Sequence, residues 1–378
     1  MTGAPGNALA GPASLAAAGH AAAEVARVMI CDDSVIIRSA IARMLEGEPD
    51  IEVVARVANG KLAIEELGRR KIDVVVMDIE MPVMDGLTAL PLLLRQDPGL
   101  RVVVASTLTT RGAEVAMEAL RLGAADYVPK PSAGEVQGDV HFRHELIAKI
   151  RGLARLRRHA ARPEPRLPQS AAPPAGATRA ANRRRPKLLA IGSSTGGPQA
   201  LFSLVQALGA ELPVPVVITQ HMPATFTKIL ADHIDRLGGM KCAEAVDGEL
   251  LAPGRIYLAP GNHHLLVQAA PGGLVARLSN DPPENFCRPA VDPMIRSASV
   301  ACDGQVLAVI LTGMGHDGLA ATRSLIDAGG TAIAQDEATS VVWGMPGAVA
   351  RAGLCHAVLP LPRIAAKINE LLGKSPVP

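Results

Sequence analysis

Short runs rich in valine and isoleucine alternate along this sequence with stretches of helical spacing. In the N-terminal part, the strand-like runs are RVMICDD, IEVVARV, IDVVVMD, RVVVAST and ADYVPKP. The helix-like segments lie between these runs and after the last one, at 35–46, 61–69, 86–96, 113–122 and 142–157. Five such strand–helix units predict an α/β domain built on a doubly wound parallel sheet.

A second α/β block follows, and we expect it to be mainly parallel and to extend to about Leu372. Its strand-like runs are KLLAIGS, VPVVITQ, GRIYLAP, LAVILTG and TAIAQD. The helix-like segments are 198–208, 225–237, 289–301 and 318–328. Hydrophobic residues make up 48% of the chain but aromatic residues only 2%, so Ala, Val, Leu and Ile must fill the cores. Buried parallel strands flanked by helices suit that composition.

Composition also predicts how the chain is divided. Residues 159–186 are dominated by Pro, Ala and Arg and have no apolar periodicity, which is typical of a linker. The first residues are rich in Ala and Gly, which indicates a disordered extension. The expected order is an extension at 1–25, a first domain at 26–158, a linker at 159–186, a second domain at 187–372 and a tail at 373–378.

Bulk properties argue against several classes of protein. The net charge of +2 is too small to indicate nucleic-acid binding, and no basic recognition helix follows the linker. Five scattered cysteines without CxxC spacing argue against a disulfide framework and favour a reducing, cytoplasmic setting. The sequence has no apolar run near 18 residues and no basic start, so we expect neither a membrane span nor a signal peptide.

Three carboxylates follow strands of the first block. Asp32 and Asp33 end the first strand, and Asp78 ends the third. Ligands of doubly wound sheets lie beyond the carboxyl ends of strands where the winding reverses, and the first and third strands are neighbours in the flavodoxin-like order. Two like charges about 4 Å apart repel by about 4 kcal/mol at an effective dielectric near 20, and a hard divalent cation relieves that repulsion. Mg²⁺ fits this donor set.

Two further polar residues fall at the same edge. Ser106 follows the fourth strand and Lys130 the fifth. A hydroxyl and an ammonium there would complement a phosphoryl group carried by a carboxylate. Helix capping explains any one of these positions, but not all five at strand ends.

The motifs CDDS, VVVMDIEMPVMDG, ASTLT and DYVPKP resemble those of response-regulator receiver domains over about residues 26–145. The resemblance implies that Asp78 accepts phosphate from a histidine kinase, with Mg²⁺ bound by Asp32, Asp33 and Asp78 and a backbone oxygen near Met81. It also implies that Ser106 senses the phosphoryl group and that Lys130 pairs with it. Tyr127 stands where the family usually has an aromatic switch residue.

In the second block, Gly192-Ser193-Ser194-Thr195-Gly196 fits G-x-S-x-G between a strand and a helix. That pattern presents a nucleophilic serine on a sharp turn. Glycines at a helix N-terminus also bind phosphate through backbone N–H groups, and this stretch favours neither use over the other.

A serine nucleophile needs a base, and the base needs a carboxylate. His221 follows the strand VVITQ, and Asp317 follows VILTG in a Gly-rich loop that could offer the backbone N–H of Met314 to an oxyanion. All three residues fall after strands. The order Ser, His, Asp differs from the Ser, Asp, His order of α/β-hydrolases.

Other histidines are weaker candidates. His263 and His264 could act as base or bind substrate, but surface or rim positions are expected for them. His316 adjoins Asp317, and adjacent residues rarely face one another well enough to pair. A metal site from His263, His264 and Asp317 lacks the usual ligand spacing.

The stretches AIGSSTGGPQAL, ITQHMP, YLAPGNHHL, RPAVDPM, ILTGMGHDG and AQDEAT…VVWGMP resemble the CheB family of chemotaxis methylesterases over roughly 187–372. The resemblance implies that Ser194 is the nucleophile, His221 the base and Asp317 its orienting partner. Met314 would lie at the oxyanion site, and Thr195 would position the base or substrate. No cofactor is implied there. Ser193 and His316 replace the alanine and asparagine that are frequent in the family.

The two resemblances together imply a phosphorylation-activated carboxylesterase that acts on glutamate γ-methyl esters of chemoreceptors and releases methanol. Glutamine deamidation is implied as a second reaction. The partners would be methyl-accepting chemoreceptors and a CheA-type histidine kinase, with the membrane approached only through the receptors. The tandem domains suggest autoinhibition of the second domain by the first.

Three other readings stay open. The second block could bind a nucleotide or a protein through its Gly-rich loop without catalysis. It could bind DNA, as effector domains behind receivers often do, although no helix-turn-helix pattern appears. It could also be an esterase acting on a receptor outside motility.

Overall fold

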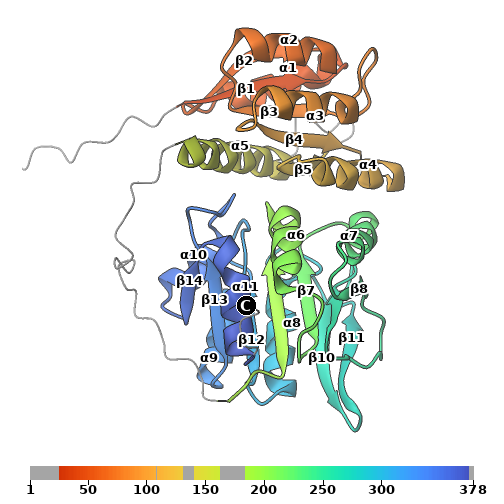
Figure 1. Ribbon diagram of the computed structural model, residues 1–378, viewed down its shortest axis with the longest axis vertical. Coiled ribbons are helices and arrows are strands. Elements are labelled where there is room, and N and C mark those ends of the chain that lie inside the picture. Colours follow the sequence, from red (N-terminus) through yellow and green to blue (C-terminus); the bar gives the residue numbers. More distant parts are fainter. Residues whose placement is uncertain (1–24, 108, 131–139, 162–183, 374–378) are drawn as a thin grey trace, which may run out of the picture.

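The computed structural model describes residues 25–107, 109–130, 140–161 and 184–373, which form two α/β units, one above the other in Figure 1. Most residues of the expected extension, linker and tail lie outside the described residues. Within the described ranges, no helix combines the length and the apolar character that a bilayer span requires.

The N-terminal unit is a parallel five-stranded sheet in the order β2-β1-β3-β4-β5. This is the doubly wound order that the alternating pattern predicted. The strands are β1 Ala26–Cys31, β2 Ile51–Val57, β3 Val74–Asp78, β4 Arg101–Ser106 and β5 Asp126–Pro129. The helices are α1 Val35–Glu46, α2 Gly60–Arg69, α3 Gly86–Gln96, α4 Thr110–Arg121 and α5 Val140–Ala161.

Side-chain caps fix the start of each of the first four helices. Ser34, Asn59, Asp85 and Thr109 accept hydrogen bonds from backbone N–H groups of the first turns of α1, α2, α3 and α4. Such caps contribute about 1 kcal/mol each. The last helix, α5, extends beyond both ends of the predicted segment 142–157 and runs three residues into the expected linker.

The C-terminal unit has a seven-stranded parallel sheet in the order β14-β13-β12-β6-β7-β9-β8. An antiparallel hairpin of β10 and β11 stands beside it, which the alternating pattern did not predict. The strands are β6 Leu188–Ser193, β7 Val216–Gln220, β8 Lys241–Glu244, β9 Arg255–Leu258, β10 His264–Ala270, β11 Gly273–Ser279, β12 Val306–Ile310, β13 Thr331–Gln335 and β14 Ala357–Leu359. The helices are α6 Gly197–Leu208, α7 Ala224–Arg236, α8 Val291–Ala301, α9 Leu319–Asp327, α10 Met345–Arg351 and α11 Leu361–Leu371.

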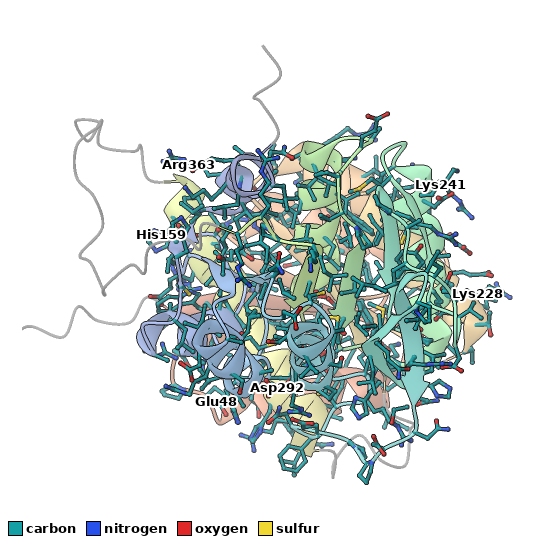
Figure 2. All side chains as sticks on the ribbon, turned by 90° about the horizontal axis from the view of Figure 1, so that it is seen from below. Glu48, His159, Lys228, Lys241, Asp292 and Arg363 are labelled. Atoms are coloured by element: carbon teal, nitrogen blue, oxygen red, sulfur yellow. The ribbon has the colours of Figure 1, made fainter. Side chains whose placement is uncertain are left out.

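Charged side chains are largely kept at the surface of this unit. In Figure 2, Lys228 and Lys241 extend from the rim, and both are exposed. Asp292 is different, because only 2% of it is exposed. A carboxylate so deeply buried needs hydrogen-bond donors around it.

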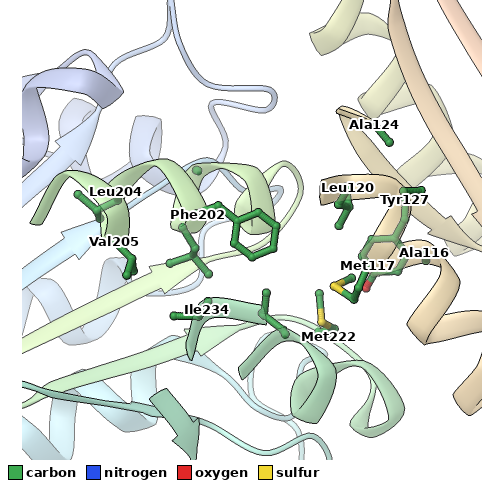
Figure 3. Close-up of a cluster of buried hydrophobic side chains, with 14 of the residues drawn as sticks. Ala116, Met117, Leu120, Ala124, Tyr127, Phe202, Leu204, Val205, Met222 and Ile234 are labelled. Carbon is green, nitrogen blue, oxygen red and sulfur yellow. The ribbon is translucent and has the colours of Figure 1, made fainter. Parts of the chain in front are cut away.

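The two units share a continuous apolar cluster. Figure 3 shows side chains of α4 and β5 facing those of α6 and α7 and the segment just before α7. At its centre, the rings of Tyr127 and Phe226 stack with centroids 4.7 Å apart. Polar contacts reinforce the cluster: Gln199 Nε2 donates to the carbonyl oxygens of Leu120 and Ala124, each at 2.6 Å. The N-terminal unit therefore rests on the edge where α6 and α7 begin.

Helix α5 makes a second contact with the C-terminal unit, through a glycine. A Cβ atom on Gly152 would lie 1.8 Å from the carbonyl oxygen of Val341. Beside it, Arg155 donates to Glu337 Oε1 at 2.9 Å and to the carbonyl of Ser340 at 2.8 Å. The close approach leaves no room for any side chain at position 152.

We expect Gly152→Ala to separate the two units, because the added methyl group overlaps a backbone oxygen that cannot rotate away. Small-angle X-ray scattering would then give a larger radius of gyration for the variant than for the wild type. Gly68→Ala is the control: it lies on the exposed face of α2, and we expect it to be neutral or to stabilise by up to about 1 kcal/mol. An unchanged radius for Gly152→Ala would contradict this packing.

Candidate functional site

The G-x-S-x-G stretch forms the turn between β6 and α6. Ser194 is partly exposed, and its N–H donates to the carbonyl of Thr312 at 3.0 Å. Its carbonyl accepts from Gly197 N–H at 2.8 Å, which closes the turn. Because α6 begins at Gly197, the positive end of the helix dipole lies beside the serine.

The turn requires glycine at position 196. Gly196 has φ of +76°, a conformation that residues with a Cβ rarely adopt. Its N–H donates to the carboxylate of Asp126, the first residue of β5, at 2.9 Å. A side chain of the N-terminal unit thus binds the backbone two residues after Ser194.

Gln220, the last residue of β7, links the serine turn to His221. Its Nε2 donates to the carbonyls of Ser194 at 2.9 Å and His221 at 3.2 Å, and its Oε1 lies 2.6 Å from Ser193 Oγ. The N–H of His221 donates to the carbonyl of Ser193 at 3.1 Å. Ser194 and His221 therefore follow neighbouring parallel strands, β6 and β7.

The imidazole of His221 is paired with Asp317. His221 Nε2 and Asp317 Oδ2 are 2.7 Å apart, and the two side chains are only 11% and 2% exposed. The structure thus brings together the predicted base and its predicted partner, which lie 96 residues apart. The prediction that both stand beyond strand ends matches their positions after β7 and β12.

Asp317 receives further hydrogen bonds from three segments. Backbone N–H groups of Val291 and Asp292, at the start of α8, donate at 2.6 and 3.1 Å, and that of Gly318 donates at 2.9 Å. Asn285 Nδ2 donates to the same carboxylate at 2.9 Å. Burial alone would raise the pKa of Asp317, but His221 and the backbone N–H groups of Val291 and Asp292 hold it below its ordinary value.

The pKa of His221 is raised to about 9. Burial acts in the opposite direction, and hydrogen bonds to Asp317 and then Cys287 outweigh it. Both hydrogen bonds favour the protonated imidazole, so His221 releases its proton less readily here than a free histidine does. For His221 to act as a base at neutral pH, its contacts with the groups that raise its pKa would have to change.

Asn285 and Cys287 are functional residues that were not predicted from the sequence. Asn285 Nδ2 also donates to Asp292 Oδ2 at 3.0 Å, so it bridges two buried carboxylates. Cys287 Sγ lies 3.4 Å from His221 Nδ1, on the side of the ring away from Asp317. The stretch PPENFCRP that carries both residues has no strand or helix pattern, so spacing gave no signal for them.

The proposed oxyanion donors stand close to Ser194. A Cβ atom on Gly313 would lie 2.9 Å from Ser194 Cβ, so the loop after β12 runs directly against the serine. The backbone N–H groups of Met314 and Thr195 find no acceptor among the described residues, whereas Gly313 N–H is bound to Val342. Free donors beside a nucleophile suit an oxyanion.

One expected contact is not formed. Among the residues that the structure describes, no hydrogen bond joins Ser194 Oγ to the His221 ring. Nε2 is bound to Asp317, and Nδ1 faces the Cys287 thiol instead of a hydroxyl. Serine, imidazole and carboxylate are thus gathered without the bond between the first two.

The remaining histidines take no part in this cluster. His264 was expected at a rim, but it is only 1% exposed. Its Nδ1 accepts from Ala290 N–H at 3.2 Å and its Nε2 faces the carbonyl of Pro282 at 3.1 Å, so it holds the loop before α8. His316 is exposed.

The N-terminal unit holds the predicted acidic cluster. Carboxylate oxygens of Asp32, Asp33 and Asp78 lie within 4.8 Å of one another. Lys130 Nζ is 2.7 Å from both Asp32 Oδ2 and Asp78 Oδ2. Burial raises the pKa of Asp78, Lys130 opposes this, and Asp32 adds to it. Three hard oxygen donors, one of them exposed, fit a divalent cation such as Mg²⁺.

Ser106 does not reach this cluster. Its hydroxyl donates to the carbonyl of Gly112 in α4 at 2.6 Å and is buried. Tyr127, the expected switch residue, points into the contact between the two units. Ser106 thus contacts α4, and Tyr127 contacts the first turn of α7.

We expect the His221–Asp317 pair to make stability depend on pH. Because the pKa of His221 is raised from 6.5 to about 9, the stabilisation is complete below pH 6.5 and is lost as pH rises through about 9. Melting temperatures measured from pH 6 to 10 should therefore fall more for the wild type than for His221→Gln. Parallel curves for the two proteins would contradict the pairing.

Comparison with known proteins adds independent information. A family model described as CheB methylesterase matches residues 189–368, and one described as response regulator receiver domain matches 28–137. A protein-glutamate methylesterase/protein-glutamine glutaminase 1 of Paramagnetospirillum magneticum is 53% identical over 367 residues, covering 92% of this chain and 96% of that protein. A protein-glutamate methylesterase/protein-glutamine glutaminase of Azospirillum brasilense is 50% identical over 386 residues, covering 96% of this chain and 98% of that protein.

Among solved structures, the CheB methylesterase catalytic domain of Thermotoga maritima is 42% identical, with a TM-score of 0.48. The match covers 49% of this chain and 98% of the Thermotoga maritima chain. The two relatives match this chain over nearly its whole length. The chain therefore belongs to the family of protein-glutamate methylesterases/protein-glutamine glutaminases, in which a receiver domain precedes a CheB methylesterase domain.

Proposed function

We propose that this protein hydrolyses glutamate γ-methyl esters of chemoreceptors, with glutamine side chains as a second substrate. The observation that carries the proposal is the buried His221–Asp317 pair, which follows the strand next to the Ser194 turn. Full-length relatives at 50% identity and above are named for both reactions. Neither reaction needs a cofactor at this site, because both are acyl transfers to a serine and then to water.

In the proposed reaction, Ser194 Oγ attacks the ester carbonyl while His221 takes its proton. Asp317 holds Nε2, so Nδ1 is the nitrogen that receives the proton. The N–H groups of Thr195 and Met314 stabilise the oxyanion. The proton returns to the departing methoxide, and methanol leaves. Water then attacks the acyl-serine by the same route and regenerates Ser194 and a glutamate. With a glutamine side chain, the leaving group is ammonia.

Asp78 is the proposed phosphoacceptor, with a CheA-type histidine kinase as donor. It is partly exposed and lies beside Asp32 and Asp33, which together would hold Mg²⁺. Bound there, the ion would neutralise charge on the incoming phosphoryl group. Lys130 contacts Asp78 already and would pair with a phosphoryl oxygen. Ser106 would turn from Gly112 toward that group.

We further propose that the receiver domain restrains the esterase domain until phosphorylation. Two neighbouring residues of β5 support this, because one contacts the Ser194 turn and the other contacts the helix that follows His221. Asp126 binds Gly196 in the Ser194 turn, and Tyr127 stacks on Phe226 in the first turn of α7, shortly after His221. Moving an equilibrium from 1% to 50% open takes about 2.7 kcal/mol, which a few charge-assisted hydrogen bonds supply.

The proposed substrates place the protein in the cytoplasm, beside the membrane only through receptors. Their methylated side chains lie on long helices, which calls for an open site. The partial exposure of Ser194 and of Met314, which is 40% exposed, suits a bulky protein substrate. No nucleic acid is involved in this proposal.

We expect Ser194→Ala to lower methanol release from methylated receptor by at least about 10³-fold, because the attacking oxygen is lost. Ser193→Ala is the matched control: its hydroxyl contacts Gln220, not substrate, so most activity should remain. Similar losses in both variants would contradict the assignment of the nucleophile.

We expect acetyl phosphate with Mg²⁺ to accelerate the wild type and to leave Asp78→Asn at its resting rate. The variant lacks the carboxylate oxygen that forms the acyl phosphate. Methanol release with and without the phosphodonor is the measurement. A response that survives in Asp78→Asn would contradict the phosphoacceptor assignment.

A further inference from the structure

The Cys287 thiol contacts Nδ1 of His221, the ring nitrogen that must accept the Ser194 proton in the proposed mechanism. Sγ lies 3.4 Å from His221 Nδ1, while Nε2 is bound to Asp317 at 2.7 Å. Of the five cysteines, four are buried, and Cys287 alone is partly exposed. A catalytic imidazole thus has a carboxylate on one side and a thiol on the other.

The loop before α8 is built to hold the thiol there. Glu284 and Cys287 exchange backbone hydrogen bonds at 3.1 and 3.0 Å, and the residues between them, Asn285 and Phe286, have φ of +53° and +64°. Arg296 on α8 clamps Glu284 with contacts of 3.0 and 2.6 Å. Two successive residues in this unfavourable conformation persist only where their surroundings enforce it.

Nδ1 has room for one hydrogen-bond partner in the ring plane. Because Nε2 is bound to Asp317, Nδ1 is the ring nitrogen left for a further bond, and it takes one in-plane partner whether it acts as donor or as acceptor. Cys287 Sγ is that partner, whether the hydrogen of the contact lies on sulfur or on Nδ1. In both forms, Ser194 Oγ is left without its base, and Ser194 makes no hydrogen bond to the ring among the described residues.

We propose that Cys287 is a positioning residue that holds His221 in a resting state, so that the Ser194–His221 bond forms only when the thiol releases Nδ1. This inference rests on the proposed function, because it concerns the same nucleophile and base. It goes further by assigning a role to a loop outside the three catalytic residues.

The charges around the ring agree with this role. The titratable groups that face the imidazole are Asp317, from the loop before α9, and Cys287, from the loop before α8. Asp292 is connected to the imidazole through Asp317, to which its carboxylate is bridged by Asn285. Glu284 and Arg296 lie nearby and pair with each other. Cys287 is among the groups that raise the pKa of His221. Removing the thiol should therefore ease deprotonation of the base.

The test compares full-length wild type, Cys287→Ala, Cys287→Ser and Ser194→Ala. Methanol release from methylated receptor is measured from pH 6 to 10, and melting temperatures show whether each variant is folded. Cys355→Ala is the control, because that cysteine is buried in the core away from the site.

For Cys287→Ala, we expect kcat/KM at pH 7 to rise at least about threefold. The acid limb of its pH profile should move down by about half a pH unit, because for a single ionisation that shift corresponds to a change of about threefold. Cys287→Ser keeps a hydroxyl that can hold Nδ1, so its profile should stay close to the wild-type profile. A purely structural thiol would instead lower the melting temperature and activity without moving the acid limb.

Three outcomes would overturn the inference. An unshifted acid limb in a folded Cys287→Ala, with Ser194→Ala inactive, removes the role of Cys287 and leaves the serine mechanism intact. Loss of activity in Cys287→Ala with activity kept in Ser194→Ala would make the thiol the nucleophile, and the proposed function of Ser194 would fail with it. An equal shift in Cys287→Ala and Cys355→Ala would mean a nonspecific effect.

Discussion

The buried carboxylate of Asp317 organises the catalytic unit. It accepts hydrogen bonds from the start of α8, from Gly318, from Asn285 and from His221. Hydrogen bonds to a charged group contribute about 1.5–3 kcal/mol each, so the set can offset the cost of burying one charge. The same carboxylate binds the start of α8, the loop before α8 and the imidazole. The position of the His221 ring therefore depends on how these segments pack.

The receiver domain reaches this machinery through a buried charge of its own. Burial raises the pKa of Asp126, against the attraction of Lys149, whose ammonium lies 3.3 Å away. Lys149 also contacts Glu145 and donates to the carbonyl of Tyr127. Such pairs cost several kcal/mol when one partner is removed. The hydrogen bond from Gly196 to Asp126 thus connects the serine turn to the buried charges of Asp126 and Lys149.

Sequence patterns predicted the features that depend on strand order. Residues at strand ends, such as Asp78, His221 and Asp317, could be placed because parallel strands end at one edge of a sheet. Contacts made by loops and between domains carried no such periodic signal. The role of Cys287 and the β10–β11 hairpin were therefore visible only in the structure. Asp126 left one hint, a charge at the start of an apolar strand, but its partner lies in the other domain.

Gly152 limits which receiver domains can pack against the esterase domain. Val341, whose carbonyl lies against Gly152, also packs its side chain against Gly196, where a Cβ would be 2.5 Å from it. One residue is thus sandwiched between the receiver helix and the turn of the nucleophile. A chimera carrying a foreign receiver would need a residue without a side chain at this point of its last helix. Whether a receiver domain fits this esterase domain therefore depends on the absence of a side chain at the position of Gly152.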